Sequence, residues 1–262
     1  MSGRVVEVSR EGPVARIVLC RPQVHNAFDE HLIAQLHEAF RRLATDEGVR
    51  VVVLAAEGPS FCAGADLDWM RRAASWGEEE NRRDAAALAA MLRAVAECPR
   101  PVVARVHGNA FGGGVGLVAA ADLAVAAAPA QFAFSEVRLG LAPATIAPHV
   151  VEKIGPGWAL RLFLTGERID AHQALRIGLL YRVVPPEELD TAVDEVVRLL
   201  LLGGPQAQAA CKELVRRVAR ERGAQVDDYT ARLIASLRSG DEGQEGVRSF
   251  LEKRRPRWAG EG

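Results

Sequence analysis

The hydrophobic pattern in the N-terminal half of the chain predicts strands and helices in alternation. Residues 6–8 and 14–19 alternate or run apolar on either side of a Glu-Gly-Pro break, which predicts an opening hairpin. Asp29 is suited to cap a helix over residues 30–44, where apolar side chains recur at helical spacing. Residues 49–55 are a short β-branched run, which is typical of a buried strand.

The same order of elements follows around residues 102–136. Apolar positions predict a helix over residues 81–98, which ends at two prolines, and an apolar strand over residues 102–106. A loop over residues 107–111 then leads to three consecutive glycines and a helix of small residues. Consecutive glycines remove every Cβ at this junction, so a substrate can lie directly on the backbone.

A weak internal repeat connects the two halves of this pattern. The motif Gly-x-x-Phe-x-x-Gly at residues 58–64 recurs at residues 108–114, each time after a valine-rich strand. Repeated strand–loop–helix units stack into a continuous core and bring their loops to the same end of the sheet. The sequence therefore predicts two backbone-lined loops that face one site, near Ala65 and near Gly113.

The helix that follows the glycine run suggests two kinds of ligand. Its first amides have no intrahelical acceptor and lie at the positive end of the helix dipole. They can bind a phosphate, or they can hold the negative oxygen that forms on a carbonyl during a reaction. Gly114-x-Gly116-x-x-Ala119 matches the dinucleotide fingerprint, but a loop separates it from the strand that should precede it directly.

The second half of the chain has a mainly helical pattern. Helical spacing recurs over residues 146–154, 157–164, 171–177, 187–202, 205–222, 225–238 and 242–253. We therefore expect an α/β core that carries the active site over residues 1–190 and a helical part over residues 191–262. No low-complexity linker divides the two parts.

Composition and charge narrow the classes of function. Apolar residues make up 49% of the 262 residues and charged residues 26%, as in an ordinary globular protein. The net charge of −1 argues against a nucleic-acid partner. Four scattered cysteines form no metal-binding motif and read as buried hydrophobes in a reducing compartment. No signal-type or membrane-spanning segment is expected, so we predict a cytoplasmic location.

Glu136 is the candidate acid/base. Its neighbours in the sequence are apolar, so desolvation should disfavour the charged form of its carboxyl group. Such a group suits a reaction in which a proton is taken and returned near neutral pH. An ion pair with Arg138 is the competing structural interpretation, and His107 and His149 read as ordinary loop or helix histidines.

Three motifs together resemble the enoyl-CoA hydratase/isomerase family, the crotonase superfamily. They are Phe61-Cys62-Ala63-Gly64-Ala65-Asp66-Leu67, His107-Gly108-Asn109-Ala110-Phe111-Gly112-Gly113-Gly114 and Ser135-Glu136-Val137-Arg138-Leu139-Gly140-Leu141-Ala142-Pro143. The resemblance covers nearly the whole chain. It implies a spiral of ββα units with a helical C-terminal trimerisation part, assembled as a homotrimer or as a homohexamer made of two trimers.

The resemblance also implies an acyl-CoA substrate and the residues that hold it. By motif position, the backbone amides of Ala65 and Gly113 would bind the thioester carbonyl oxygen, with Glu136 as the catalytic carboxylate. The implied contacts to CoA and substrate are Val24, His25, Ala27, Ala63, Ala65, Asp66, Leu67, Gly113 and Pro143, with Phe250 and Lys253 reaching the CoA of a neighbouring subunit. No metal and no separate cofactor is implied, because coenzyme A is part of the substrate.

One departure from the family pattern affects the predicted reaction. Typical hydratases carry two glutamates, and the first of these positions is Gly116 here, while the second is Glu136. We therefore expect a hydratase that adds water to a 2-enoyl-CoA. A double-bond isomerase that uses Glu136 alone, and a non-catalytic acyl-CoA-binding subunit, remain as alternatives.

The acyl group is the least determined feature. The sequence around Glu136 resembles that of bacterial hydratases that act on methylglutaconyl-type or related branched enoyl-CoA. In such a protein Arg138 or His149 would meet a substrate carboxylate. Trp69, Met70 and Trp76 are candidates for the wall of the acyl pocket, with a plain core role as the alternative.

Overall fold

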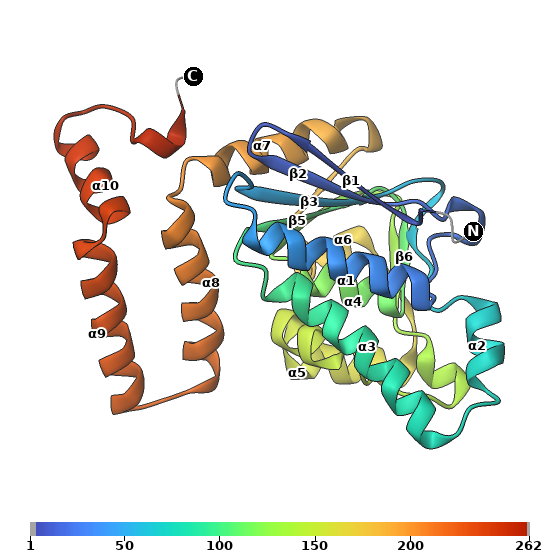
Figure 1. The fold of residues 1–262 in the computed structure, drawn as a ribbon. Helices are drawn as coiled ribbons and strands as arrows, with labels where there is room; N and C mark the ends of the chain where they lie inside the picture. Colours follow the sequence, from blue (N-terminus) through green and yellow to red (C-terminus); the bar gives the residue numbers. More distant parts are fainter. Residues whose placement is uncertain (1–3, 261–262) are drawn as a thin grey trace.

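Two sheets organise the fold, which a computed structural model describes for residues 4–260. The larger sheet has six strands, and its β1–β2 hairpin is antiparallel while its other neighbours are parallel. The strands of this sheet, in spatial order, are β1 (Val6–Glu11), β2 (Val14–Leu19), β3 (Val51–Ala56), β5 (Val102–Val106), β7 (Leu123–Ala127) and β10 (Arg182–Val184). The predicted hairpin and the buried strands at β3 and β5 are therefore confirmed (Figure 1).

The smaller sheet has four short strands and carries the loops of the repeat. These strands are β4 (Ser60–Cys62), β6 (Asn109–Phe111), β8 (Gln131–Ala133) and β9 (Arg168–Asp170). Each of β3, β5 and β7 is followed by a short strand in this second sheet, as expected for a spiral of ββα units. Strands β4 and β6 lie within stretches that the sequence pattern predicts as loops, because three residues are too few to show a period of two.

Helices cover the sheets and connect their strands. In the body of the protein they are α1 (Glu30–Thr45), α2 (Leu67–Ala73), α3 (Glu78–Ala96), α4 (Gly113–Ala120), α5 (Ala147–Thr165), α6 (Ala171–Arg176) and α7 (Leu189–Leu201), with 3₁₀ turns η1 (Pro22–Val24), η2 (Glu136–Leu139), η3 (Pro186–Glu188) and η4 (Arg257–Ala259). Asp29 caps α1 by accepting a hydrogen bond from the Leu32 amide at 2.8 Å. The two helices predicted over residues 146–164 form one kinked helix, because Gly155 takes a φ of 76° just before Pro156.

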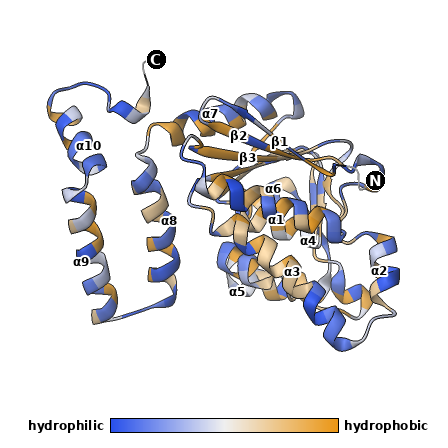
Figure 2. Ribbon diagram, in the orientation of Figure 1, coloured by the Kyte–Doolittle hydropathy of each residue, from blue (hydrophilic) through white to orange (hydrophobic). Residues whose placement is uncertain are grey.

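The larger sheet is buried on both faces. All six residues of β3 are buried, and alternate residues enter two separate hydrophobic clusters. Helices α1 and α3 contribute to the first cluster, while α7 packs on the opposite face of the sheet through residues such as Val193 and Val197. Figure 2 shows the orange, hydrophobic strands between these helices. The packing of α7 groups it with the core, although the expected division lies at residues 190 and 191.

The last three helices have a different environment. Helices α8 (Pro205–Arg220) and α9 (Ala224–Ser239) lie side by side, and α10 (Asp241–Leu251) continues from α9 (Figure 1). No residue of α8 or α9 is buried. Arg50 connects this part to the body by donating to the carbonyl oxygens of Gly203 and Trp258 at 2.6 and 2.9 Å. Over residues 4–260, no helix is both long enough and apolar enough to cross a membrane.

Candidate active site

The structure brings the two glycine loops of the repeat into direct contact. Gly64 has a φ of 94°, and a Cβ atom built on it would lie 3.0 Å from the carbonyl oxygen of Phe111. A Cβ on Gly112, whose φ is 48°, would lie 3.9 Å from the Cα of Gly64. Both glycines are therefore required by backbone conformation, and at Gly64 also by the space between the loops.

A third segment, residues 21–28, anchors the first loop. The amide of Ala63 donates to the carbonyl of His25 at 2.9 Å. On either side of Ala65, the Phe28 amide donates to Gly64 at 2.6 Å and the Asp66 amide donates to Phe28 at 2.9 Å. The segments that the resemblance assigns to CoA, around residues 24–27 and 63–67, are thus neighbours.

Buried charges hold these segments in register. Arg21 lies 3.0 Å from a carboxylate oxygen of Asp29 and 3.0 Å from one of Asp66, and all three side chains are largely buried. Burial acts to raise the pKa of Asp66, but hydrogen bonds from the amides of Trp69 and Asp68, together with Arg21, hold it below its usual value. Asp66 therefore stays ionised and caps the start of α2.

Asn26 completes this anchor, and it lies within residues 24–27, which the resemblance assigns to CoA, although no structural role was predicted for it. It is fully buried with a φ of 54°, and its amide group donates to the carbonyls of Glu57 and Ser60 at 2.8 and 2.9 Å. Its side-chain oxygen accepts from the Arg21 amide at 2.8 Å. The only local sign of this structural role in the sequence is the residue type, because asparagine tolerates the left-handed backbone region better than most residues.

The amides of Ala65 and Gly113 are free to bind a ligand. Within the described part of the chain, neither amide has a hydrogen-bond acceptor. Gly113 is the first residue of α4, so its amide lies at the positive end of that helix. A Cβ on Gly113 would lie 2.5 Å from the ring of the buried Phe28, so no larger residue fits there.

Glu136 lies against the second loop. Its Oε1 atom is 3.0 Å from the position that a Cβ on Gly112 would occupy. Its Oε2 atom is buried and has no hydrogen-bond partner among the described residues. Burial raises the pKa of this carboxyl above its ordinary value of 4.5, and a backbone hydrogen bond opposes that shift only in part. The group is suited to exchange a proton with a ligand.

The competing role for Glu136, an ion pair with Arg138, does not occur. No salt bridge joins them in the part of the chain that the structure describes, and Arg138 instead lies beside Gly166, with its Nε 3.2 Å from the position of a Cβ there. His107 is hydrogen-bonded through Nε2 to the carbonyl of Gly58 at 2.8 Å, as expected for an ordinary loop histidine, but its buried Nδ1 has no partner among the described residues. His149 lines a separate cavity beside α8.

A cavity of about 340 Å³ joins these groups. Of the predicted site residues, those that line it are Ala63, Ala65, Gly113, Glu136 and Pro143, together with Trp69 and Met70 from the predicted acyl wall. Those that do not line it are Val24, His25, Ala27, Asp66, Leu67, Phe250, Lys253 and Trp76. Leu67 and Phe250 are strongly exposed, at 69% and 81%, so they are available to a ligand or a partner outside the cavity.

The position of the missing first glutamate is filled by apolar side chains. A Cβ on Gly116 would lie 2.9 Å from the Cβ of Ile146 and 3.7 Å from a methyl group of Leu92. The structure therefore has no space at Gly116 for a second carboxylate. Sequence reasoning identified the glycine but missed Ile146, because the contact joins α4 to residues thirty positions away.

A second carboxyl group nevertheless lines the cavity. Asp84 of α3 belongs to the lining, as does Leu88 one turn later on the same helix. The indole nitrogen of Trp69 donates to Asp84 at 3.2 Å. Sequence reasoning missed Asp84, because in the sequence it is one of many charged residues at the start of an amphipathic helix.

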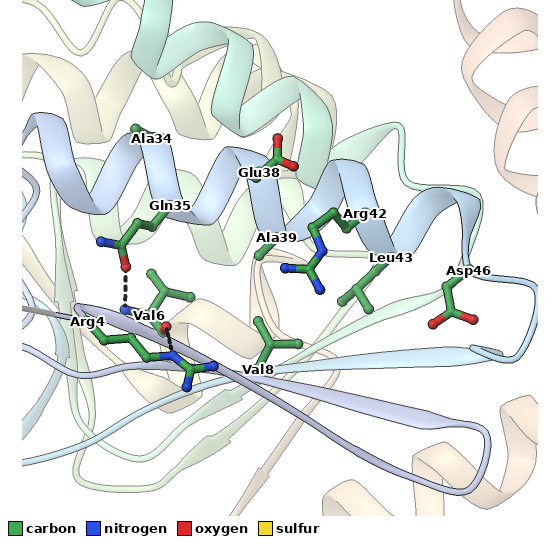
Figure 3. Close-up of a pocket in the computed structure, with 10 residues that line it drawn as sticks. All are labelled: Arg4, Val6, Val8, Ala34, Gln35, Glu38, Ala39, Arg42, Leu43 and Asp46. Atoms are coloured by element: carbon green, nitrogen blue, oxygen red, sulfur yellow. Dashed lines mark hydrogen bonds between the residues drawn. The ribbon is translucent and has the colours of Figure 1, made fainter.

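A larger cavity, of about 490 Å³, lies elsewhere and contains none of the predicted site residues. Figure 3 shows it between β1 and α1, with Val6, Val8 and Leu43 pointing into it and charged side chains around it. The two hydrogen bonds drawn join side chains to the backbone of Val6: the Val6 amide donates to Gln35 and Arg4 donates to the Val6 carbonyl, each at 3.3 Å. This cavity is a space between α1 and β1, and we assign it no role in the site.

Comparisons with known proteins find similarity over nearly the whole chain. The family model described as enoyl-CoA hydratase/isomerase matches residues 9–261. Enoyl-CoA hydratase ACTT6 of Alternaria alternata is 35% identical over 95% of this chain and 82% of its own. A trans-2-decenoyl-acyl-carrier-protein isomerase of Streptococcus mutans is 31% identical over 94% and 95%. The crystal structure of an enoyl-CoA hydratase from Shewanella pealeana superposes with a TM-score of 0.94 at 38% identity, over 97% and 96% of the two chains.

Proposed function

Because this chain belongs to the enoyl-CoA hydratase/isomerase family, we propose that it is an enoyl-CoA hydratase, which adds water reversibly to a 2-enoyl-CoA. One observation carries the proposal: among the described residues, two backbone amides and the Oε2 atom of Glu136 have no hydrogen-bond partner, and all three belong to residues that line the same cavity. The amides suit a carbonyl that becomes negatively charged, and the carboxyl group suits proton transfer.

In the proposed reaction the thioester carbonyl oxygen accepts hydrogen bonds from the amides of Ala65 and Gly113. Addition of water to C3 pushes the electrons of the double bond toward this oxygen and gives an enolate. The dipole of α4 adds to the stabilisation of that charge. The loss of one such donor typically costs about 2.7–4 kcal/mol of activation free energy.

Glu136 moves the proton. Its carboxylate takes a proton from water as the new C3–O bond forms, and it then returns a proton to C2 of the enolate. The hydrogen and the hydroxyl therefore reach the same face of the double bond. A single carboxyl group is enough for these two proton transfers. The raised pKa of Glu136 favours them, because a general acid/base works best when its pKa lies near the pH of the reaction.

The rest of the assignment concerns CoA and assembly. Val24, His25, Ala27, Asp66 and Leu67 are proposed to hold CoA outside the cavity, where residues 24–27 and 63–67 lie together. No cofactor beyond the CoA of the substrate is needed for this chemistry. A cytoplasmic location fits the cysteine usage and remains a proposal.

A homotrimer, or a pair of trimers, is proposed as the assembly. In Figure 1, α10 lies at the opposite end of the molecule from α2, whose Trp69 and Met70 line the cavity. Phe250 and Lys253 therefore cannot serve the cavity of their own chain, and they fit the role of CoA contacts to a neighbouring subunit. Exposed apolar side chains on α8, α9 and α10 support burial against such a neighbour.

Double-bond isomerisation is the second candidate, and the filled position at Gly116 favours it. With Ile146 in place of a second carboxylate, water is held from one side only. Glu136 could then move a proton between C4 and C2 of a 3-enoyl-CoA with no water in the reaction. The third possibility, a silent acyl-CoA-binding subunit, predicts tight CoA binding without any turnover.

The test compares two substrates and one variant. Purified protein is incubated with a 2-enoyl-CoA and, separately, with a 3-enoyl-CoA, and 3-hydroxyacyl and 2-enoyl products are measured by mass spectrometry and absorbance. A hydratase makes the 3-hydroxyacyl product from the first substrate, whereas an isomerase makes only the 2-enoyl product from the second. In Glu136→Gln we expect a loss of about 10²–10⁴-fold in kcat with nearly unchanged CoA affinity.

The matched control is Glu79→Gln, which changes an exposed carboxylate on α3 that is paired with Arg82. It should retain the wild-type rate. Unchanged turnover in Glu136→Gln would overturn the assigned role of Glu136.

A further inference from the structure

We propose that Asp84 determines specificity at the acyl end of the cavity, so that the site selects 2-enoyl groups with an uncharged end and rejects those that end in a carboxylate. This inference rests on the proposed hydratase function, because it assigns the substrate class of the same site. It is carried by the position of Asp84 in the cavity lining and by the charges around it.

Helix α3 presents one face to the cavity. Asp84, Leu88 and Leu92 are spaced four residues apart, so they lie along one side of the helix. Leu92 lies outside the cavity lining and packs against α4, where one of its methyl groups is 3.7 Å from the position of a Cβ on Gly116. Asp84 lies two turns earlier, about 12 Å along the helix axis, which places it away from the oxyanion amides.

Trp69 fixes the orientation of this carboxyl group. Its indole is 93% buried and donates to Asp84 at 3.2 Å, and both residues line the cavity together with Met70 and Leu88. The part of the cavity wall next to the carboxylate is therefore mainly apolar. A half-buried carboxylate in such a wall is poorly screened by water, so its charge acts on whatever lies beside it.

The charges near the cavity are unbalanced. Among the described residues that line it, the ionisable side chains are Asp84 and Glu136, and no lysine, arginine or histidine is present. Arg72 is a cation that acts on Asp84, and it is paired with Glu30 at 2.7 Å. Burial raises the pKa of Asp84, and the hydrogen bond from Trp69 and the charge of Arg72 oppose that shift only in part.

This distribution of charge argues against a dicarboxylic acyl group. A carboxylate at the distal end of the substrate would be placed in an apolar wall, near a second carboxylate and without a cation. Arg138 and His149, the candidates for meeting such a group, lie outside the lining. A methyl end packs on Met70 and Leu88, and a hydroxyl end can donate to Asp84.

The experiment uses matched pairs of 2-enoyl-CoA substrates with six, eight and ten acyl carbons. Within each pair, one substrate ends in a methyl group and the other in a carboxylate. The wild-type protein, Asp84→Asn and Asp84→Ala are compared by kcat/KM for both members of each pair. Asp84→Asn keeps the acceptor for Trp69 and removes the charge, whereas Asp84→Ala removes both.

We expect the wild-type protein to prefer the methyl-ended substrate at every length. In Asp84→Asn, the ratio of kcat/KM for the carboxylate-ended to the methyl-ended substrate should rise on the order of tenfold at one or more lengths. Glu79→Gln, an exposed change on the same helix, should leave this ratio as in the wild type.

The experiment distinguishes failure of the proposed hydratase function from failure of the proposed role of Asp84. If the wild-type protein hydrates none of the substrates, the proposed function fails. If it hydrates them and the ratio in Asp84→Asn equals the wild-type ratio at all three lengths, or if carboxylate-ended substrates are preferred, the role of Asp84 is overturned. A ratio that changes only in Asp84→Ala identifies Asp84 as a structural partner of Trp69 and also overturns the proposal.

Discussion

The active-site cavity and the C-terminal helices both have groups that the fold leaves without a partner. In the cavity these groups are polar, and on the C-terminal helices they are apolar. In the cavity, three polar groups have no partner among residues 4–260: the amides of Ala65 and Gly113 and the Oε2 atom of Glu136. On the C-terminal helices, apolar side chains are uncovered, among them Val215 at 65% exposure and Val247 at 56%. Unpaired polar groups at a cavity are suited to a ligand that carries charge, whereas uncovered apolar groups are suited to another protein surface.

The difference also shows in how each region is held. The cavity rests on a sheet with fully buried strands and on a network of buried charges at Arg21. The C-terminal helices are joined to the body largely by polar contacts, such as Lys212 with Asp122 at 2.6 Å and Arg216 with the carbonyl of Ala96 at 2.7 Å. The buried sheet therefore holds the active-site residues in fixed positions. The C-terminal helices keep an exposed apolar surface that can bind another subunit.

The largest expected effect concerns the uncovered helices. Val215→Asp places a charge on the face proposed to be buried in the trimer, so we expect the dissociation constant of the assembly to rise by about a hundredfold or more. Sedimentation velocity across micromolar concentrations measures this shift. Glu213→Gln, an exposed change two residues earlier on α8, is the control. A Val215→Asp protein with wild-type assembly would show that this face is not the interface.

The next effect concerns the filled position in the cavity. Gly116→Glu forces a side chain into the space of Ile146, so it should destabilise the fold by about 1–3 kcal/mol through overpacking. In a chain of this size the melting temperature should fall by roughly 2–10 °C. The double variant Gly116→Glu with Ile146→Ala should recover part of that loss, as measured by calorimetry and a double-mutant cycle. Equal loss in the single and double variants would contradict the role of Ile146.

A smaller effect is the pH dependence of turnover. The carboxylate form of Glu136 must be present to take a proton from water, and burial raises the pKa of this group. As the pH falls through that raised pKa, kcat/KM for hydration should decrease by about tenfold per pH unit. The midpoint should lie above 4.5, the ordinary value for a glutamate. A profile that is flat down to the acid unfolding of the protein, monitored by circular dichroism, would contradict this assignment.

The smallest effect is on stability. Because the pKa of Glu136 is raised on folding, the proton stabilises the folded state below the unfolded pKa, and that contribution is lost as the pH rises through the folded pKa. At pH 8 the charged carboxylate is therefore unfavourable, and Glu136→Gln should melt at an equal or higher temperature than the wild type, by a few degrees at most. The difference should disappear near pH 4. A lower melting temperature at pH 8 would mean that the carboxylate makes stabilising contacts.

Local features of the sequence were enough to predict much of the fold and part of the site. The opening hairpin, α1 with its Asp29 cap and strands β3 and β5 follow from periodicity and capping, which depend on near neighbours in the chain. The repeat of glycines at residues 58–64 and 108–114 predicted two loops with an exposed backbone. Their position after successive strands predicted that they meet at the same end of the sheet. The apolar neighbours of Glu136 likewise predicted its raised pKa.

Other features depended on contacts between distant segments, and only the tertiary structure decided them. Strands β4 and β6 exist because they pair with each other across about fifty residues, although each is too short to show a period. Arg138 turns toward Gly166 and leaves Glu136 unpaired, Ile146 fills the space beside Gly116, and Asp84 joins the cavity wall through Trp69. A charge or a methyl group has no fixed neighbour until the chain has packed, so no local pattern could reveal these contacts.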